Sequence, residues 1–267
     1  MPRVRRVLLV LFLAMLASVP AAAAEPSALV KARTLYNAGD FDGAIAAAAE
    51  VRTGDWADAA LLVAARSHLE KFRRDSQPGE LQTGRDALNG VRASSLMPRD
   101  QIDLLVGMGQ FLYLSEEFGA ASNLFDNALA QAFLLNRQDR LQLLDWWATA
   151  RDRAAQARPS ERRGEDFAAI LTRMEDELRR DAANPVANYW SAVAARSAGD
   201  VDRAWDAAVA AWLRSRLMPD GAVTLRADLD RLMTQGIIPE RARLHKGVPD
   251  AARVMREQWE QLKEQWK

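Results

Sequence analysis

Cysteine is absent from the 267-residue sequence, and histidine occurs only twice, as His68 and His245. Without cysteine the chain can form no disulfide, so packing alone must hold it together. The two histidines are far apart in sequence and have no cysteine to complete a metal site. Each is therefore interpreted as a surface or boundary side chain, and we expect neither a metal ion nor a cofactor.

Sequence patterns that carry chemistry are missing as well. There is no glycine-rich phosphate loop ending in Gly-Lys-Ser/Thr and no Gly-x-Ser-x-Gly elbow. Acid pairs such as Glu116-Glu117 could be the two carboxylates of a glycosidase, but we interpret them as helix starts. With no nucleophile, base and orienting group in one pattern, we predict no catalytic residue and no enzyme activity.

An excess of charge of one sign is also absent, because 36 basic residues face 36 acidic ones. This balance gives no electrostatic reason to bind nucleic acid. Alternating runs of Val, Ile and Thr are missing, whereas Ala, Leu, Arg and Glu are abundant, which favours helices. Hydrophobic residues make up 49% of the sequence and charged residues 27%, a profile typical of a folded globular chain.

Residues 1–24 have the features of a secretory signal peptide. Arg3, Arg5 and Arg6 precede an unbroken apolar stretch, and the small residues before Ala24 form a cleavage pattern. The apolar stretch is shorter than the roughly 20 residues that span a bilayer, which disfavours a retained membrane anchor. We expect cleavage after Ala24, a periplasmic or secreted protein, and no membrane span once the signal is removed.

Three segments repeat one pattern: a helix, a short glycine or acidic turn, an aromatic residue or Val, and an Ala three positions later. The glycine tolerates a positive φ at the end of the first helix, and the acidic residue suits the start of the second. The segments are Gly39-Asp40-Phe41-Asp42-Gly43-Ala44, Glu116-Glu117-Phe118-Gly119-Ala120-Ala121 and Gly199-Asp200-Val201-Asp202-Arg203-Ala204.

These segments resemble the tetratricopeptide repeat family, with the clearest repeats at 28–55, 102–132 and 185–215. In the second repeat, Gly109 and Ala121 fall in the small-residue positions where the paired helices of the family touch. The other matching positions of that repeat are Leu105, Met108, Leu112, Phe125 and Ala128. The pattern departs from the family in two ways. The position at which the family has Trp is not Trp in any of the three repeats, and the closing Pro position holds Trp56 in the first repeat and Phe133 in the second.

The resemblance implies an all-α fold, a right-handed α-α superhelix of about five to six helical hairpins over residues 25–267. The gaps from Gly39 to Glu116 and from Glu116 to Gly199 are each about two 34-residue units with a surplus, which predicts one further hairpin in each gap. A capping region is expected at 220–267. It has one helix ending near Gly236 and Pro239, then a terminal helix with Trp259 and Trp266 on one face.

The function is expected to lie in a binding surface, because no chemistry is found. In the family that the sequence resembles, first-helix residues line the concave face of the superhelix. Carried over by position, these residues are Leu29, Arg33, Tyr36, Asn37, Val106, Gln110, Tyr113, Tyr189 and Arg196. They include all three tyrosines of the chain, a residue type enriched in binding hot spots.

The sequence thus predicts an exported protein–protein interaction module that binds a peptide or envelope-protein partner, and it does not identify the partner. Two alternatives stay open. One is a structural or assembly subunit of a cell-envelope complex that works through its edges or through the Trp259/Trp266 helix. The other is a helical cell-wall hydrolase.

Overall fold

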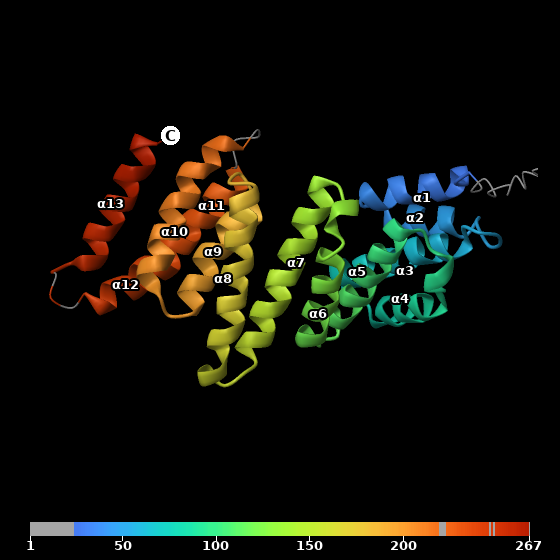
Figure 1. The fold of residues 1–267 in the computed structure, drawn as a ribbon, viewed down its shortest axis with the longest axis horizontal. Helices are drawn as coiled ribbons and strands as arrows, with labels where there is room; N and C mark the ends of the chain where they lie inside the picture. The colour runs from blue at the N-terminus through green and yellow to red at the C-terminus, as the bar shows by residue number, and fades with distance from the viewer. Residues whose placement is uncertain (1–23, 219–222, 246, 248, 267) are drawn as a thin grey trace, which may run out of the picture.

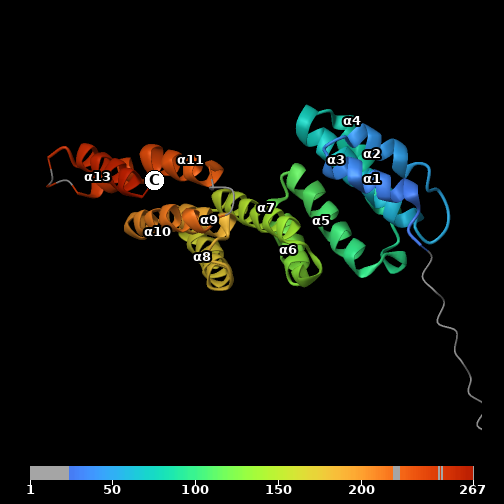
Figure 2. The ribbon, with the colours of Figure 1, turned by 90° about the horizontal axis from the view of Figure 1, so that it is seen from above.

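The computed structural model describes residues 24–218, 223–245, 247 and 249–266, and these residues form helices and turns with no strand. The predicted signal segment, apart from Ala24, lies outside the described residues. Figure 1 shows the helices following one another along the long axis of the molecule, and Figure 2 shows the same order from above. The expectation of an all-α fold is confirmed.

The helices differ in length from one part of the chain to the next. The α-helices are α1 Ser27–Asn37, α2 Phe41–Ala48, α3 Ala57–Asp75, α4 Pro78–Gly90, α5 Pro98–Leu114, α6 Phe118–Leu129, α7 Arg137–Gln156, α8 Arg163–Arg180, α9 Pro185–Ser197, α10 Val201–Arg214, α11 Val223–Leu232, α12 Ile238–Leu244 and α13 Ala251–Gln265. Short 3-10 helices are η1 Ala93–Ser95, η2 Ala132–Leu134, η3 Ser160–Arg162 and η4 Ser215–Leu217, and η5 Met233–Ile237 is a π-helix.

Each helix packs mainly on its neighbours in the sequence. The pairs α1–α2, α3–α4, α5–α6, α7–α8 and α9–α10 are in contact, and each second helix also contacts the first helix of the next pair. First helices touch one another in the series α1, α3, α5 and again in the series α7, α9, α11. The pairs α3–α4 and α7–α8 are the extra hairpins predicted in the two gaps, and α3, α7 and α8 are longer than every other described helix.

The three predicted turns share one backbone geometry. Gly39, Glu116 and Gly199 have positive φ values of 78°, 64° and 84°. In each turn this residue donates its N–H three residues back, and the following residue donates five residues back, as from Asp40 to the Leu35 carbonyl. This double hydrogen bond is the Schellman motif, which satisfies the last carbonyl groups of a helix. The predicted left-handed helix end is therefore confirmed at Gly39 and Gly199. Glu116 was interpreted from the sequence as part of a helix start, but it takes the left-handed position that ends α5.

The predicted caps of the second helices hold at two turns and fail at the third. The Asp40 carboxylate accepts from the Gly43 N–H at 2.9 Å, and the Asp200 carboxylate accepts from the Arg203 N–H at 3.0 Å. Glu117 occupies the same position before α6, but its side chain makes no capping hydrogen bond. The shorter carboxylates reach the N3 amide directly, which explains why Asp is preferred to Glu as an N-cap.

The small residues predicted at helix contacts are buried. Ala44, Ala121 and Ala204 are each fully buried. A Cβ atom added to Gly109 would lie 2.5 Å from Cε1 of Phe125, so α5 and α6 approach too closely for any larger residue. This contact confirms the pairing of Gly109 with the second helix of its hairpin.

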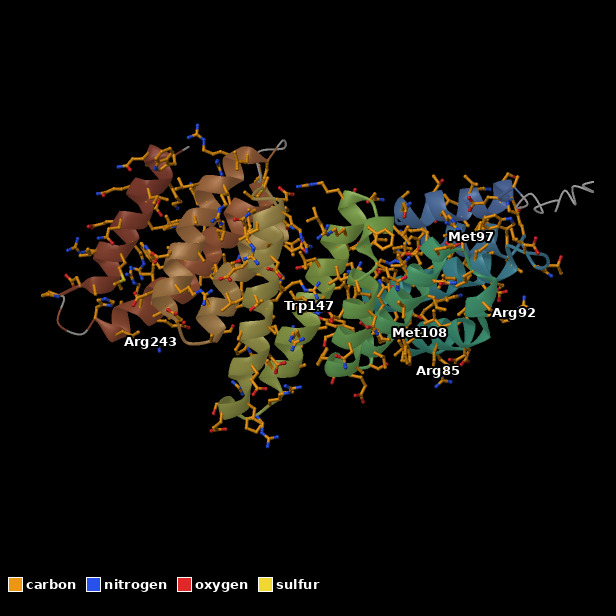
Figure 3. The ribbon with its side chains drawn as sticks, in the orientation of Figure 1. Arg85, Arg92, Met97, Met108, Trp147 and Arg243 are labelled. Atoms are coloured by element: carbon orange, nitrogen blue, oxygen red, sulfur yellow. The ribbon has the colours of Figure 1, made fainter. Side chains whose placement is uncertain are left out.

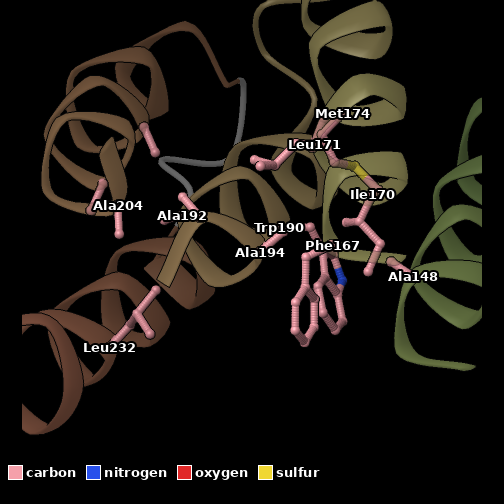
Figure 4. Packing of buried hydrophobic residues seen from close by; sticks show 14 of the residues in the cluster. Ala148, Phe167, Ile170, Leu171, Met174, Trp190, Ala192, Ala194, Ala204 and Leu232 are labelled. Atoms are coloured by element: carbon pink, nitrogen blue, oxygen red, sulfur yellow. The ribbon is translucent and has the colours of Figure 1, made fainter. Parts of the chain in front are cut away.

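The buried apolar residues form two clusters that meet at α5. One cluster runs from Leu29 of α1 to Leu104 of α5, and the larger one runs from Ile102 of α5 to Trp259 of α13. Trp147 of α7 lies near the middle of the array in Figure 3, where the guanidinium carbon of Arg173 stands 4.9 Å from its ring centroid. Figure 4 shows part of the larger cluster, with Phe167 and Ile170 of α8 near Trp190 of α9.

The helix predicted to end near Gly236 and Pro239 instead continues to Leu244. The π-helix η5 joins α11 to α12 without a break, since the residues on both sides of it keep right-handed helical dihedrals. Pro239 directly follows the π-helix, where the backbone hydrogen bonding already departs from the α pattern, so its missing N–H does not end the helix. Gly236 leaves room for the guanidinium of Arg196, which would stand 2.9 Å from an added Cβ. The predicted helix end was therefore wrong, because the wider π turn absorbs both residues.

Helix α13 packs against α12 and fills the C-terminal end of the core. Trp259 is fully buried, its ring lies 5.2 Å from that of Trp212, and its Nε1 donates to Asp230 at 2.9 Å. Trp266, predicted on the same face, is 43% exposed and stands beside Arg216. Trp259 thus holds this helix from within the core, whereas Trp266 contacts η4 at the surface.

Candidate binding cavities

The main cavity has a volume of about 450 Å³ and lies among α1, α3, α5, the turn after η2, and α7. It is therefore built by the first helices of four successive pairs. Its lining residues are Arg33, Tyr36, Asn37, Ala59, Leu62, Val63, Arg66, Arg99, Asp100, Asp103, Val106, Gln110, Leu134, Leu135, Asn136, Asp139, Gln142, Leu143 and Trp146. A volume of this size is in the range of sites that hold a small ligand or a short stretch of peptide.

A chain of ion pairs crosses one side of the cavity. Arg66 of α3 donates to Asp103 of α5 at 2.7 Å. Arg99 of α5 lies 2.6 Å from Asp103 and 2.6 Å from Asp139 of α7. Because the chain Arg66–Asp103–Arg99–Asp139 joins three helices, it fixes the spacing of the cavity walls.

A second ion pair ties the N-terminal helix to the same wall. Arg33 of α1 donates to Asp100 of α5 at 2.9 Å and also lies 3.0 Å from Glu25. Asp100 is buried, and its arginine partner compensates a charge that would otherwise be costly to bury. In the cavity, each lining arginine is thus paired with a lining aspartate.

The floor of the cavity combines Tyr36, Arg66 and Gln110. The Arg66 guanidinium lies 4.9 Å from the Tyr36 ring centroid, and burial raises the pKa of the Tyr36 phenol. Burial alone would lower the pKa of Arg66, but neighbouring anionic groups, including Asp103 and Glu70, raise it instead. Tyr36 therefore stays neutral and Arg66 stays charged across the physiological pH range.

Two polar atoms of this floor have no hydrogen-bond partner. Gln110 is only 2% exposed, and its Nε2 donates to Glu70 at 3.0 Å, but its Oε1 accepts from no group. The Nε of Arg66 is likewise buried without a partner. An unmade hydrogen bond of a buried group costs about 1–3 kcal/mol, and the folded chain carries this cost at both atoms.

The cavity also has apolar lining residues. They are Leu62 and Val63 of α3, Val106 of α5, and Leu143 and Trp146 of α7. The Trp146 ring contacts those of Phe125 at 5.8 Å and Tyr113 at 5.1 Å between ring centroids. The lining thus combines hydrogen-bonding groups with hydrocarbon.

A second cavity of about 310 Å³ lies between α9 and the π segment of the α11–α12 helix. Arg196 lines it but is committed to Glu240, to which it donates two hydrogen bonds at 2.9 and 2.6 Å. Burial is the main cause that raises the pKa of Tyr189, which also lines this cavity. The other lining residues are Asp228, Arg231, Leu232, Gln235 and Gly236.

The residues predicted from the family resemblance divide between these places. Five line the main cavity, namely Arg33, Tyr36, Asn37, Val106 and Gln110, and two line the second cavity, namely Tyr189 and Arg196. Tyr113 lies outside both linings and contacts Trp146. Leu29 is fully buried in the N-terminal cluster, because α1 turns this residue toward the core rather than toward the cavity. Neither Tyr113 nor Leu29 is therefore placed to touch a ligand in these cavities.

The lining residues of α3 and α7, and Arg99, Asp100 and Asp103 of α5, were not predicted from the sequence. Arg66, Asp139 and Trp146 belong to the two hairpins in which no repeat motif was aligned, so no position could be carried over. One signal was available, because Arg99 and Asp103 stand four residues apart on a predicted helix and form the ion pair that this spacing favours.

Two further features of the described residues concern metal binding and membrane crossing. Among the residues that the structure describes, no group of three His, Cys, Asp or Glu side chains is arranged to hold a metal ion. In the same part of the chain, no helix combines the length and apolar character needed to cross a bilayer. Comparison of the chain with protein-family models, with curated proteins and with solved structures found no match.

Proposed function

We propose that the chain is an exported helical-repeat protein, similar to the tetratricopeptide repeat family, that binds a peptide or an envelope-protein partner. In this proposal the hairpins form a right-handed superhelix, and the partner lies against its first helices. The observation that carries the proposal is the main cavity, which α1, α3, α5 and α7 build together and which contains Tyr36, Val106 and Gln110.

The chemistry of the cavity favours binding over hydrolysis. The aspartates Asp100, Asp103 and Asp139 do come together there, as a glycosidase would need. Each is held in an ion pair with an arginine. The hydrolase alternative would therefore need at least one of these carboxylates to leave its arginine partner.

The assembly-subunit alternative depends on the edges of the helical array or on the C-terminal helix. Trp259 is unavailable to a partner because it is buried against Trp212. Only Trp266 offers apolar area, and Arg216 already lies over its ring. The main cavity gives a larger and more varied contact than this single side chain.

Blocking the mouth of the main cavity tests the proposal. Asn37 is an exposed lining residue at the end of α1, and Asn37→Trp places a large ring over the cavity without changing the core. The matched control is Ala38→Trp, at the next exposed position, which is not part of the lining. The measurement is affinity capture from an envelope fraction, with circular dichroism to verify folding.

We expect the original chain and Ala38→Trp to retain the same partner and Asn37→Trp to lose it. Equal capture by all three proteins would refute binding at the main cavity. In that case, deletion of residues 250–267 shows whether the C-terminal helix is responsible.

A further inference from the structure

On the side of the first helices, the packing of the array is interrupted between α5 and α7. The helices α1, α3 and α5 touch in series, and so do α7, α9 and α11. In the part of the chain that the structure describes, the step from α5 to α7 is instead occupied by the main cavity, which both helices line. On the other side the packing is continuous, because α6 contacts both α5 and α7. A larger spacing between α5 and α7 would therefore widen the cavity, with α6 as the fixed side.

Two side-chain contacts span this step, one toward each end of α5. At the N-terminal ends of both helices, Nη2 of Arg99 lies 2.6 Å from Oδ2 of Asp139. Near the C-terminal end of α5, the ring of Tyr113 meets that of Trp146 edge to face, with centroids 5.1 Å apart. Trp146 also contacts Phe125 of α6. The step is thus closed by an ion pair at one end and by a cluster of three rings at the other.

Both members of the ion pair keep another partner if they separate. Arg99 also lies 2.6 Å from Asp103 on its own helix. Asp139 accepts from Nδ2 of Asn136 at 3.0 Å, and it stands in the first turn of α7, where the helix dipole favours a carboxylate. The side chains of Arg99 and Asp139 are 34% and 37% exposed, and solvent weakens an ion pair at that exposure. Separating the pair therefore costs little free energy.

The N-terminal end of α7 is attached more firmly to α8 than to α5. Arg140 donates two hydrogen bonds to the buried carboxylate of Glu177 in α8, at 2.7 and 2.6 Å. Breaking this pair would strip a buried carboxylate of both hydrogen bonds, which is costly. If this end of α7 moves away from α5, α8 therefore moves with it.

We propose that the ion pair Arg99–Asp139 is a latch that closes the main cavity, and that its release lets the N-terminal end of α7 swing away from α5. The contact of Trp146 with Tyr113 and Phe125 is the pivot. The lining residues directly before α7, such as Leu135, move with it, so the cavity widens. This inference rests on the proposed function for what the opening admits, whereas the opening itself can be measured without a partner.

Pulsed electron paramagnetic resonance, which measures the distance between two spin labels, tests the latch. Because the sequence has no cysteine, Lys31→Cys on α1 and Gln138→Cys on α7 take the labels at these two exposed positions alone. The variants of this labelled chain are Arg99→Gln, which breaks the pair, and Arg203→Gln, the matched control. Arg203 of α10 forms an exposed ion pair with Glu175 of α8, so the control removes the same charge away from the step between α5 and α7.

We expect the label distance to lengthen by more than about 2 Å in Arg99→Gln, beyond ordinary shifts of packed helices, and to stay unchanged in Arg203→Gln. Raising the NaCl concentration from about 0.05 to about 0.5 M should lengthen the distance in the labelled chain but not in Arg99→Gln, because salt screens an exposed ion pair. Circular dichroism verifies folding, and Asp139→Asn breaks the same pair if Arg99→Gln does not fold. An unchanged distance in a folded variant of the pair, no response of the labelled chain to salt, or an equal lengthening in Arg203→Gln would each overturn the latch.

These distances separate the latch from the proposed function. If no distance changes while Asn37→Trp still abolishes partner capture, the latch fails alone. If the distance lengthens in Arg99→Gln but Asn37→Trp captures the partner as well as the original chain does, the latch stands and binding at the main cavity is refuted.

Discussion

At the scale of single residues, the three left-handed turns share a backbone conformation but not a residue type. Gly39 and Gly199 supply the positive φ at no steric cost, but Glu116 adopts φ 64° with a side chain. A left-handed conformation costs a non-glycine residue about 1–2 kcal/mol. The turn persists because its two backbone hydrogen bonds and the contact of α5 with α6 fix it.

Glu116→Gly should therefore stabilise the protein. Removing the Cβ relieves the strain, and part of that gain is offset by the greater freedom of glycine in the unfolded chain, which leaves about 0.5–1 kcal/mol. Thermal unfolding followed by circular dichroism measures the effect as a higher Tm. The control is Ser115→Gly at the preceding position, where φ is −89° and glycine brings no relief. A Tm that falls in both variants would show that the turn carries no strain.

At the scale of elements, buried carboxylates join helices that apolar contacts alone would leave loosely placed. Asp58 at the start of α3 accepts from the Arg92 N–H at 3.0 Å, from the Arg92 Nη2 at 2.8 Å, and from the Ser95 hydroxyl at 2.6 Å. These bonds hold the connection between α4 and α5 against α3. They lower the pKa of Asp58 from 3.8 to about 2, with the Arg92 side chain as the largest favourable cause.

This carboxylate predicts a loss of stability in acid. Because the pKa of Asp58 is lower in the folded state, its contribution is present above about pH 4 and lost as the pH falls toward about 2. The contribution amounts to about 1–2 kcal/mol, allowing for screening around the exposed Arg92. Urea unfolding at several pH values should show Asp58→Asn less stable than the original chain above pH 5, with the difference shrinking below pH 4. A difference that does not vary with pH would contradict this role.

The sequence predicted those elements whose signals are local. The turns at Gly39, Glu116 and Gly199 and the small residues Gly109 and Ala121 were found because each position needs a particular backbone or a particular size. The continuation of α11 through Pro239 was not found, since it depends on the π turn and on Arg196 filling the space at Gly236. Such compensation comes from a different helix and leaves no local pattern.

The candidate site was predictable to a similar, partial extent. Tyr36 and Gln110 were placed by alignment to the repeat pattern, and both line the main cavity. Arg66 and Trp146 come from hairpins without a recognisable repeat, so only the packing of α3 and α7 reveals them. Leu29 shows the opposite difficulty: it occupies a position that the repeat pattern assigns to the concave face, but the structure buries it in the core.

At the scale of the whole molecule, contacts between neighbouring helices dominate, and the buried apolar residues fall into two clusters. In arrays of this kind, stability is close to a sum over units and their interfaces, so damage at one end is not transmitted to the other. The cluster of α1–α5 and the C-terminal end of the larger cluster should therefore respond independently to mutation.

Two matched core truncations test this independence. Trp259→Ala removes a fully buried ring at the C-terminal end, and Leu62→Ala removes a buried side chain from α3 at the other end. We expect the free energy of unfolding to fall by about 3–5 kcal/mol for Trp259→Ala and by about 2–5 kcal/mol for Leu62→Ala, because each substitution leaves a cavity. Hydrogen exchange should accelerate in α10–α13 for Trp259→Ala and in α1–α4 for Leu62→Ala, with the distant helices unchanged. Uniform acceleration along the chain in either variant would mean that the helices unfold as one cooperative unit, and stability would then not be additive along the array.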